Sequence, residues 1–510
     1  MISPMLATQP VRRWLIAALL LATAIRAYLL WQYYCISSDG VVYIRAAQDF
    51  FAGKLSAGLQ SVYPPGYPLL IAAIYPLIGD WELAGQILSL LFGVGLLLPI
   101  YFICRDMFNS KIALLACCLA AVSPFLALYS VHVRSEISYL FLSTMAFYLF
   151  FIAIERRAVS RFFFAGLLAG YAFLIRPEAI GFLAIVPGVL LLRWLVWRES
   201  SITEFVQSIA ALCAGFLIFA LPYIVYLSID TGRLGAISRK AGVTLAINLQ
   251  ESGLLEDGVQ DQQTDVGSFI FTDYLLTHPF LYIKKVASDL LPAIWTFIQA
   301  LYYSYLPFLL LGLFAAFRKD RFARRHLLLI GFVLFYVFGF ALIYVKRRYA
   351  LQAVPLSLAW VAVGMGFVWE QMRARLTLKR ASLTAAGIGL IFIASTLPRT
   401  LKPVSQEKAF VRQAGWYLKA RNRDGSLSVA AFDERVAFYA AARSILLTKI
   451  DSVSMASYLR DQKADYLAAE AKIFAKMLPE VSRRPERFGL VLEQNFVGTH
   501  NDRMLLFKVS

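Results

Sequence analysis

The sequence is poor in charged residues for its length. Charged residues make up 16% of the 510 residues and hydrophobic residues 59%, with a mean hydropathy of +0.64. Soluble domains contain about 25% charged and roughly 45–50% apolar residues. The composition therefore excludes a chain made only of soluble domains, and the aromatic share of 15% fits a protein with many membrane–water interfaces.

Cysteine is also scarce and shows no functional spacing. The five cysteines lie in or beside apolar runs, or follow the first run, and form neither a CxxC pair nor a cluster with histidine. A zinc site or a disulfide framework would need such a pattern. The sequence therefore indicates neither.

Positive charge is abundant, but its placement argues against a nucleic-acid partner. The net charge of +18 comes from short basic clusters between apolar runs, a pattern that membrane topology produces. The first apolar run follows Arg12 and Arg13, is too long for a signal peptide and lacks a small-residue cleavage site. We interpret it as a signal anchor.

The apolar runs predict about eleven transmembrane helices, because a span needs roughly 20 mostly apolar residues. The runs are 13–33, 83–104, 111–129, 137–154, 162–175, 179–197, 204–227, 296–317, 326–345, 350–369 and 382–398. The expected fold class is a polytopic α-helical membrane protein with a small C-terminal α/β domain. The expected domains are a transmembrane domain over 1–398 and a soluble external domain over 399–510.

Basic clusters occupy alternate loops, so the positive-inside rule places the N-terminus in the cytoplasm. Two long loops, near 34–82 and 228–295, and the tail then face outward, where we expect the chemistry. In the tail, the patterns predict strands at 426–432, 465–469, 488–494 and 504–509 and helices at 437–443 and 455–463.

The first external loop begins with the segment SSDG, which contains Asp39 and is followed by Tyr43. A carboxylate there can reach both a lipid-borne and a water-soluble substrate. The alternative is that Asp39 caps an amphipathic helix over 41–51. Further along, Tyr63 and Tyr67 flank a Pro-Pro-Gly turn, which is mainly a structural signal.

A second external acid, Glu136, follows Arg134 immediately before an apolar helix. The helix dipole favours an acid in a first helical turn, so Glu136 has a purely structural alternative. Two carboxylates on one membrane face can also divide the roles of general base and orienting or metal-holding group.

Two basic positions are exceptions to the positive-inside pattern: Arg176, which precedes Pro177 and Glu178, and the run Lys346, Arg347 and Arg348. Cations near the membrane surface suit an anionic phosphate headgroup. The alternatives are contact with ordinary phospholipid or a salt bridge between Arg176 and Glu178.

In this order, the segments resemble the GT-C superfamily of integral-membrane glycosyltransferases, in particular the branch of aminoarabinose transferases and protein O-mannosyltransferases. The resemblance covers about 13–370 and rests on SSDGVVYIRAAQDFFAGKL, YPPGYPLL, SPFLALYSVHVRSEISYLF, GLLAGYAFLIRPEAIGF, HPFLYIKK and KRRYALQAVP. Each segment is weak by itself, and their order is moderately specific.

The resemblance implies an inverting transfer from a polyprenyl-phosphate-linked sugar to an acceptor hydroxyl on the external face. It makes Asp39 the candidate general base, Glu136 the second acid and Arg348, with Arg347, the donor-phosphate site, while His278 opens a segment that encloses substrate. Asp39 is followed by glycine where many relatives have glutamate, which puts a second carboxylate role beside it in doubt. The Pro-Pro segment also lacks the nearby lysine of aminoarabinose transferases, which argues against that sugar and acceptor.

The expected partners are the polyprenyl-phosphate sugar, an acceptor glycan, lipid or protein, and membrane lipids, without nucleic acid. No cofactor is expected with certainty, and a divalent metal is possible but not expected; the lack of a credible P-loop or GxGxxG motif fits a nucleotide-independent reaction. The expected location is the bacterial inner membrane, with the C-terminal domain in the periplasm. The alternatives are a transporter or lipid flippase, a glycan ligase or polymerase of the same fold, and a relative that lost catalysis.

Overall fold

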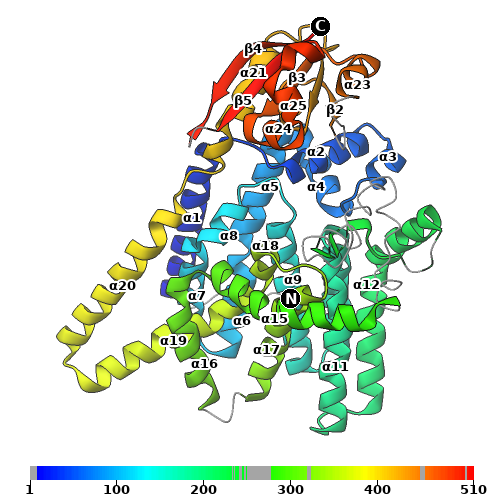
Figure 1. The fold of residues 1–510 in the computed structure, drawn as a ribbon. Helices are drawn as coiled ribbons and strands as arrows, with labels where there is room; N and C mark the ends of the chain where they lie inside the picture. Colours follow the sequence, from blue (N-terminus) through cyan, green and yellow to red (C-terminus); the bar gives the residue numbers. More distant parts are fainter. Residues whose placement is uncertain are drawn as a thin grey trace. The chain divides into compact units, whose positions relative to one another are not determined.

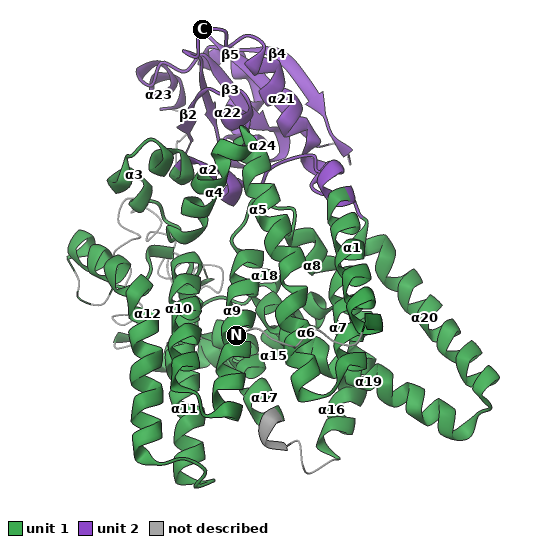
Figure 2. Cartoon of the chain, turned by 180° about the vertical axis from the view of Figure 1, so that it is seen from behind, with its two compact units in different colours: residues 1–27, 46–401 green, residues 28–45, 402–510 purple. Residues whose placement is uncertain are grey.

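The structure is a computed structural model, and it describes residues 9–510 except 233, 235, 241–243, 246–247, 250–276, 319–322, 448–453 and 500–501. The chain forms two compact units, which Figure 2 colours separately. The first unit contains residues 1–27 and 46–401. The second contains residues 28–45 and 402–510, so the end of the first helix and the start of the loop that follows it belong with the C-terminal part. The expected boundary between membrane and soluble parts near 398 stays a prediction.

The first unit is helical (Figure 1). In its N-terminal half the elements are α1 (Gln9–Trp31), α2 (Ser38–Phe51), α3 (Leu55–Leu59), α4 (Gly66–Ile78), α5 (Trp81–Gly95), α6 (Leu97–Met107), α7 (Ser110–Val122), α8 (Pro124–Tyr129), α9 (Glu136–Arg156) and α10 (Val159–Ile175). The others are η1 (Pro177–Gly181), α11 (Phe182–Leu195), α12 (Ile202–Thr231), α15 (Pro279–Leu301), η4 (Tyr303–Tyr305), α16 (Leu306–Phe317), α17 (Ala323–Phe338), η6 (Gly339–Leu342), α18 (Arg347–Ala350), η7 (Leu351–Ala353), α19 (Val354–Arg375) and α20 (Leu378–Thr400). The last residues of α1 and the first of α2 belong to the second unit.

Local sequence signals explain where several helices begin. Asp80 caps α5 by accepting a hydrogen bond from the backbone N–H of Leu83 at 2.8 Å. Ser201 and Glu204 form a capping box at the start of α12. A Pro after Ser123 separates α7 from α8, which divides the run predicted at 111–129.

Every predicted span coincides with helical structure. In the described part of the chain, seven helices are long and apolar enough to cross a membrane, and an eighth candidate is the pair 279–301 and 303–317, bent by 91°. Three shorter apolar helices, at 110–122, 159–175 and 326–342, fall on the remaining predicted spans. The span predicted at 296–317 is wrong in detail, because Tyr302 adopts a positive φ of 80° and divides that run between two helices.

The second unit contains a mixed five-stranded sheet of order β2-β1-β3-β5-β4. Its strands are β1 (Ser428–Ala431), β2 (Arg443–Leu446), β3 (Tyr466–Glu470), β4 (Leu490–Val497) and β5 (Arg503–Val509). β1 pairs in parallel with β2 and β3, whereas β5 pairs antiparallel with β3 and β4. The helices are α21 (Ala409–Lys419), α22 (Arg435–Tyr439), α23 (Met455–Asp461), α24 (Ala471–Met477) and α25 (Pro479–Arg483), with short η8 (Gln406–Lys408) and η9 (Pro485–Phe488).

The small α/β domain is confirmed, with one error in its elements. The four predicted strands correspond to β1, β3, β4 and β5, and the helix predicted at 455–463 corresponds to α23. The helix predicted at 437–443 is wrong in its second half, because α22 ends at Tyr439 and Arg443 begins β2. Hydrogen bonding of β2 to β1 outweighs the weak helical pattern there.

Candidate active site

Glu136, Arg176 and Glu178 form a buried ion cluster in the first unit. Arg176 Nη1 lies 3.3 Å from Glu136 Oε1, and Arg176 Nη2 lies 2.7 Å from Glu178 Oε1. The Arg176 side chain is 4% exposed and that of Glu136 is 5% exposed. The salt bridge to Glu178, one of the alternatives for Arg176, is therefore present, and the second partner is Glu136, which the sequence had placed 40 residues away.

Glu136 and Arg176 both lie at helix ends, which places their side chains close together. Glu136 is the first residue of α9, so the dipole-favoured position is also observed. Arg176 is an extended residue between α10 and η1, because Pro177 cannot continue the helix. Its guanidinium thus leaves the helix and meets the carboxylate at the start of α9.

Tyr349 connects this cluster to the basic run before α19. Its ring centroid lies 5.3 Å from the Arg176 guanidinium and 4.9 Å from that of Arg348. Arg348 Nη2 also donates to the Tyr349 hydroxyl at 3.0 Å, and the ring stacks on Phe340. The structure therefore brings together three residues chosen from separate sequence motifs: Glu136, Arg176 and Arg348.

The field in this cluster is positive. The charges of Arg176, Arg134, Arg348 and Lys240 all act on the Glu136 carboxylate. With Glu178, these described residues comprise four cations and two carboxylates, a net charge of +2. Glu136 Oε2 is buried and has no hydrogen-bond partner among the described residues. Such a surplus of positive charge at a buried site suits an anionic ligand.

The rest of the basic run lies beside other aromatic rings. The guanidinium of Arg347 is 4.3 Å from the ring centroid of Phe125 in α8, and Arg399 of α20 lies 5.5 Å from the same centroid. Lys346 Nζ lies 4.1 Å from the ring centroid of Tyr344. Lys346 and Arg347 are exposed, so both remain accessible to a headgroup.

The predicted substrate-binding tyrosines of the first unit differ in environment. Tyr67 is fully buried, and its hydroxyl bonds to Ser89 at 2.8 Å and donates to the Gly85 carbonyl at 3.1 Å, which fixes α4 against α5. Tyr63 is 8% exposed, with Lys240 Nζ 4.1 Å from its ring centroid. His278 is exposed at the start of α15, with Nδ1 2.8 Å from Thr277 Oγ1. The roles of these residues in binding stay predictions.

Asp39 and Tyr43 lie in the second unit, on α2. The first turn of this helix is capped by Ser37, whose Oγ accepts a hydrogen bond from the Gly40 N–H at 3.1 Å. Ser37 rather than Asp39 therefore caps the helix, and Asp39 follows as a half-buried acid in the first turn, a position that the helix dipole also favours. Its role as base stays a prediction. Tyr43 is 2% exposed.

Several charged or aromatic residues near the site were not predicted from the sequence. Lys240, Tyr349 and Arg399 take part in the charged environment, but none stands out from its neighbours in sequence. Lys285 is 2% exposed and donates to the carbonyls of Ala341 and Ile343 at 2.8 and 3.0 Å, which supports the segment leading to Lys346. Lys285 ends the motif HPFLYIKK, and this position in the ordered motifs was the signal available in the sequence.

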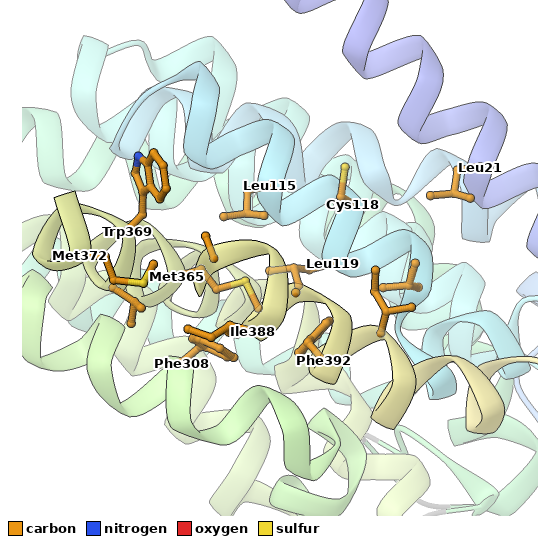
Figure 3. Close-up of a pocket in the computed structure, with 15 residues that line it drawn as sticks. Leu21, Leu115, Cys118, Leu119, Phe308, Met365, Trp369, Met372, Ile388 and Phe392 are labelled. Carbon is orange, nitrogen blue, oxygen red and sulfur yellow. The ribbon is translucent and has the colours of Figure 1, made fainter. Parts of the chain in front are cut away.

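Within the described ranges, no group of three or more His, Cys, Asp or Glu side chains is arranged to hold a metal ion. A cavity of about 390 Å³ in the first unit is lined by apolar side chains of α1, α7, α16, α19 and α20, among them Phe308, Trp369 and Phe392 (Figure 3). It shares no lining residue with the ion cluster.

Comparisons with known proteins agree with this architecture. A family model described as dolichyl-phosphate-mannose-protein mannosyltransferase matches residues 62–226, about a third of the chain. No curated protein sequence matches. ArnT from Cupriavidus metallidurans, solved bound to undecaprenyl phosphate, is similar with 13% identity and a TM-score of 0.56 over 98% of each chain. The archaeal oligosaccharyltransferase AglB from Archaeoglobus fulgidus, solved with an inhibitory peptide and a dolichol-phosphate, gives 13% identity and a TM-score of 0.57 over 91% of this chain and 70% of AglB.

At these identities the structural likeness establishes the fold. The chain has the GT-C fold of integral-membrane glycosyltransferases, as the ordered motifs predict. It is a multi-pass membrane protein whose apolar helices are joined to a small C-terminal α/β part.

Proposed function

We propose that this protein is an inverting glycosyltransferase that moves a sugar from a polyprenyl-phosphate donor to an acceptor hydroxyl on the external face of the membrane. The observation that carries the proposal is the net positive cluster of Glu136, Glu178, Arg134, Arg176, Arg348 and Lys240. Within it, Glu136, Arg176 and Arg348 come from separate sequence motifs. Two structures of similar fold, ArnT and AglB, were solved with a polyprenyl or dolichol phosphate, which supports a lipid phosphate as the ligand of such a site.

The proposed reaction needs few groups. Asp39 accepts the proton of the acceptor hydroxyl while its oxygen attacks the anomeric carbon from the side opposite the phosphate. The bond from that carbon to the phosphate oxygen breaks, and the electron pair leaves with the polyprenyl phosphate. Arg348 and Arg347, with Lys346, neutralise the negative charge that develops there. A positioned carboxylate base contributes roughly 10²–10⁴-fold to such a step.

Glu136 and Arg176 act less directly in this scheme. Arg176 is already held between two carboxylates, so we propose that it helps to hold the donor phosphate while fixing Glu136. Tyr43, Tyr63, Tyr67, Arg134 and His278 remain the proposed substrate-binding residues. The proposed location is the inner membrane, with the N-terminus cytoplasmic and the C-terminal domain periplasmic.

The test is release of polyprenyl phosphate by the purified protein from a panel of short-chain polyprenyl-phosphate mono- and oligosaccharides, with a bacterial membrane extract added as the source of acceptor. Asp39→Asn keeps the size of the side chain and removes the base, so we expect a loss of roughly 10²-fold or more in turnover. The control is Asp49→Asn, a second acid on the same helix, which should retain turnover.

Each result separates the alternatives. Equal release by wild type and Asp39→Asn would remove Asp39 from the mechanism. Release only from a lipid-linked oligosaccharide would instead favour a ligase of the same fold. Binding of the lipids without release from any donor would contradict the transferase and favour a transporter or a relative without activity.

A further inference from the structure

The C-terminal domain holds residues 33–45, the segment that carries Asp39, which is called the gripped segment below. All the contacts lie within the second unit. Ser38, the residue before Asp39, donates from Oγ to Asp433 Oδ2 at 2.7 Å. Arg45, on the same helix, forms an ion pair of 2.8 Å with Glu434. Two consecutive acids at the turn before α22 therefore hold α2 on either side of Asp39.

The backbone leading to Asp39 is held as well. The Tyr439 hydroxyl accepts a hydrogen bond from the Ile36 N–H at 2.7 Å and another from Arg412 at 3.0 Å. Arg412 also donates to the Tyr33 carbonyl at 3.2 Å. The Tyr34 N–H donates to the Val404 carbonyl at 3.0 Å. The domain thus fixes the backbone three residues before Asp39.

Asp433 is itself held in place by ionic contacts within the C-terminal domain. Asp433 accepts hydrogen bonds from both the backbone N–H and Nε of Arg435 at 2.8 Å, and Arg435 Nη2 lies 3.6 Å from Glu470. Glu470 is at the end of β3 and pairs with Lys408 at 2.7 Å. Burial opposes ionisation of Asp433, but the bonds and charge of Arg435 outweigh it and lower the pKa of Asp433 below its usual value. The acceptor for Ser38 is therefore an ionised carboxylate tied to the sheet.

We propose that Asp433 and Tyr439 are positioning residues for Asp39, and that holding this external-loop segment is a function of the C-terminal domain. The inference rests on the proposed function, in which Asp39 is the base. A base must lie within hydrogen-bond reach of the hydroxyl it deprotonates, and a misplacement of about 1 Å costs roughly 10²-fold in rate. Contacts to Ser38 and Ile36 fix both the helix turn and the entering backbone, so they restrict where Asp39 can lie.

The variants remove these contacts one at a time. Each single variant removes one partner of a hydrogen bond to the gripped segment: Asp433→Ala, Tyr439→Phe or Ser38→Ala. The double variant Asp433→Ala/Ser38→Ala tests whether Asp433 acts through Ser38. Glu493→Ala and Tyr417→Phe are matched controls, because the Tyr417 hydroxyl donates to Glu493 at 2.8 Å in the same domain without contacting the gripped segment.

Turnover of a polyprenyl-phosphate monosaccharide is the first readout. We expect kcat to fall roughly tenfold to hundredfold in the Asp433 and Tyr439 variants, with KM for the donor changed only a few-fold. The double variant should fall no further than the more severe single one. Asp433→Glu, which retains the charge, should restore part of the activity, whereas both controls should match wild type.

The second readout is independent of activity. Cys35 lies in the gripped segment, is fully buried, and has Arg435 Nη1 4.0 Å from its sulfur. The other four cysteines belong to the first unit. Alkylation of Cys35 by N-ethylmaleimide, followed by peptide mass spectrometry, therefore reports opening of this segment, and loss of one hydrogen bond should accelerate it about fivefold.

The outcomes separate the inference from the proposed function. Faster Cys35 alkylation with lower kcat, in these variants and not in the controls, supports the positioning role. Unchanged alkylation overturns the grip, and faster alkylation with unchanged kcat overturns its catalytic role. A wild type inactive on every donor overturns the proposed function and the catalytic role with it, while the Cys35 rates still decide whether the domain holds the segment. If Asp433→Ala does not fold, the exposed Ser38→Ala variant gives the same decision.

Discussion

At the scale of single residues, Arg176 shows how a charge within the helical unit is accommodated. A buried arginine is costly unless it is paired, and here it meets two carboxylates from different chain segments. Its position before a proline was readable from the sequence, and so was its pairing with the nearby Glu178. The partner Glu136 was not, because the contact depends on how α9 packs against α10.

This pairing makes Arg176 a stability determinant as well as a proposed phosphate ligand. Arg176→Met would leave Glu136 and Glu178 buried without their cation, so we expect a loss of about 3–5 kcal/mol in the free energy of unfolding. Arg421→Met is the control, because Arg421 is 43% exposed and pairs with Glu493 at 3.4 Å; its loss should be below about 1 kcal/mol. Thermal unfolding in detergent measures both, and similar shifts would contradict the assignment.

At the scale of elements, close helix pairs organise the first unit. Gly312 of α16 and Gly364 of α19 face each other, and a Cβ at either would overlap a backbone carbonyl oxygen of the other helix, Trp360 or Phe308. Small residues allow helix backbones to approach in a membrane, where lipid gives no hydrophobic drive for helix association. The sequence predicts both helices but not this pairing, because glycine is also common in membrane helices that face lipid.

A glycine at a close helix contact and a glycine in open space should respond differently to an added methyl group. Gly364→Ala forces α16 and α19 apart, and overpacking of this kind costs typically 1–3 kcal/mol. Gly387→Ala, in α20, meets nothing within 4 Å and should be tolerated. Size-exclusion profiles after heating would show the difference, and equal melting of the two variants would count against the tight α16–α19 contact.

At the scale of the whole molecule, the charge pattern predicts which parts face outward. Alkaline phosphatase fused after Ser510 should be active, because the enzyme folds only outside the cytoplasm, while a fusion after Leu376, in a basic loop, should be inactive. The same two fusions to green fluorescent protein should give the opposite result. Activity at Leu376 and not at Ser510 would reverse the orientation and move Asp39 to the cytoplasmic face.

The sequence by itself determined the helical membrane class, the approximate position of each span and the small α/β tail. These follow from local composition, because a run of apolar residues in a bilayer must satisfy its backbone hydrogen bonds within its own helix. The order of short motifs also determined the GT-C fold, which the structural likeness confirms.

Only the tertiary structure decided which distant residues meet. It joined Glu136 to Arg176, set Arg176 and Arg348 around Tyr349, and associated residues 28–45 with the C-terminal part of the chain rather than with the helices that follow them in sequence. Pairing of this kind depends on packing between elements that are distant in sequence, and the residues around one ionisable side chain do not identify its partner.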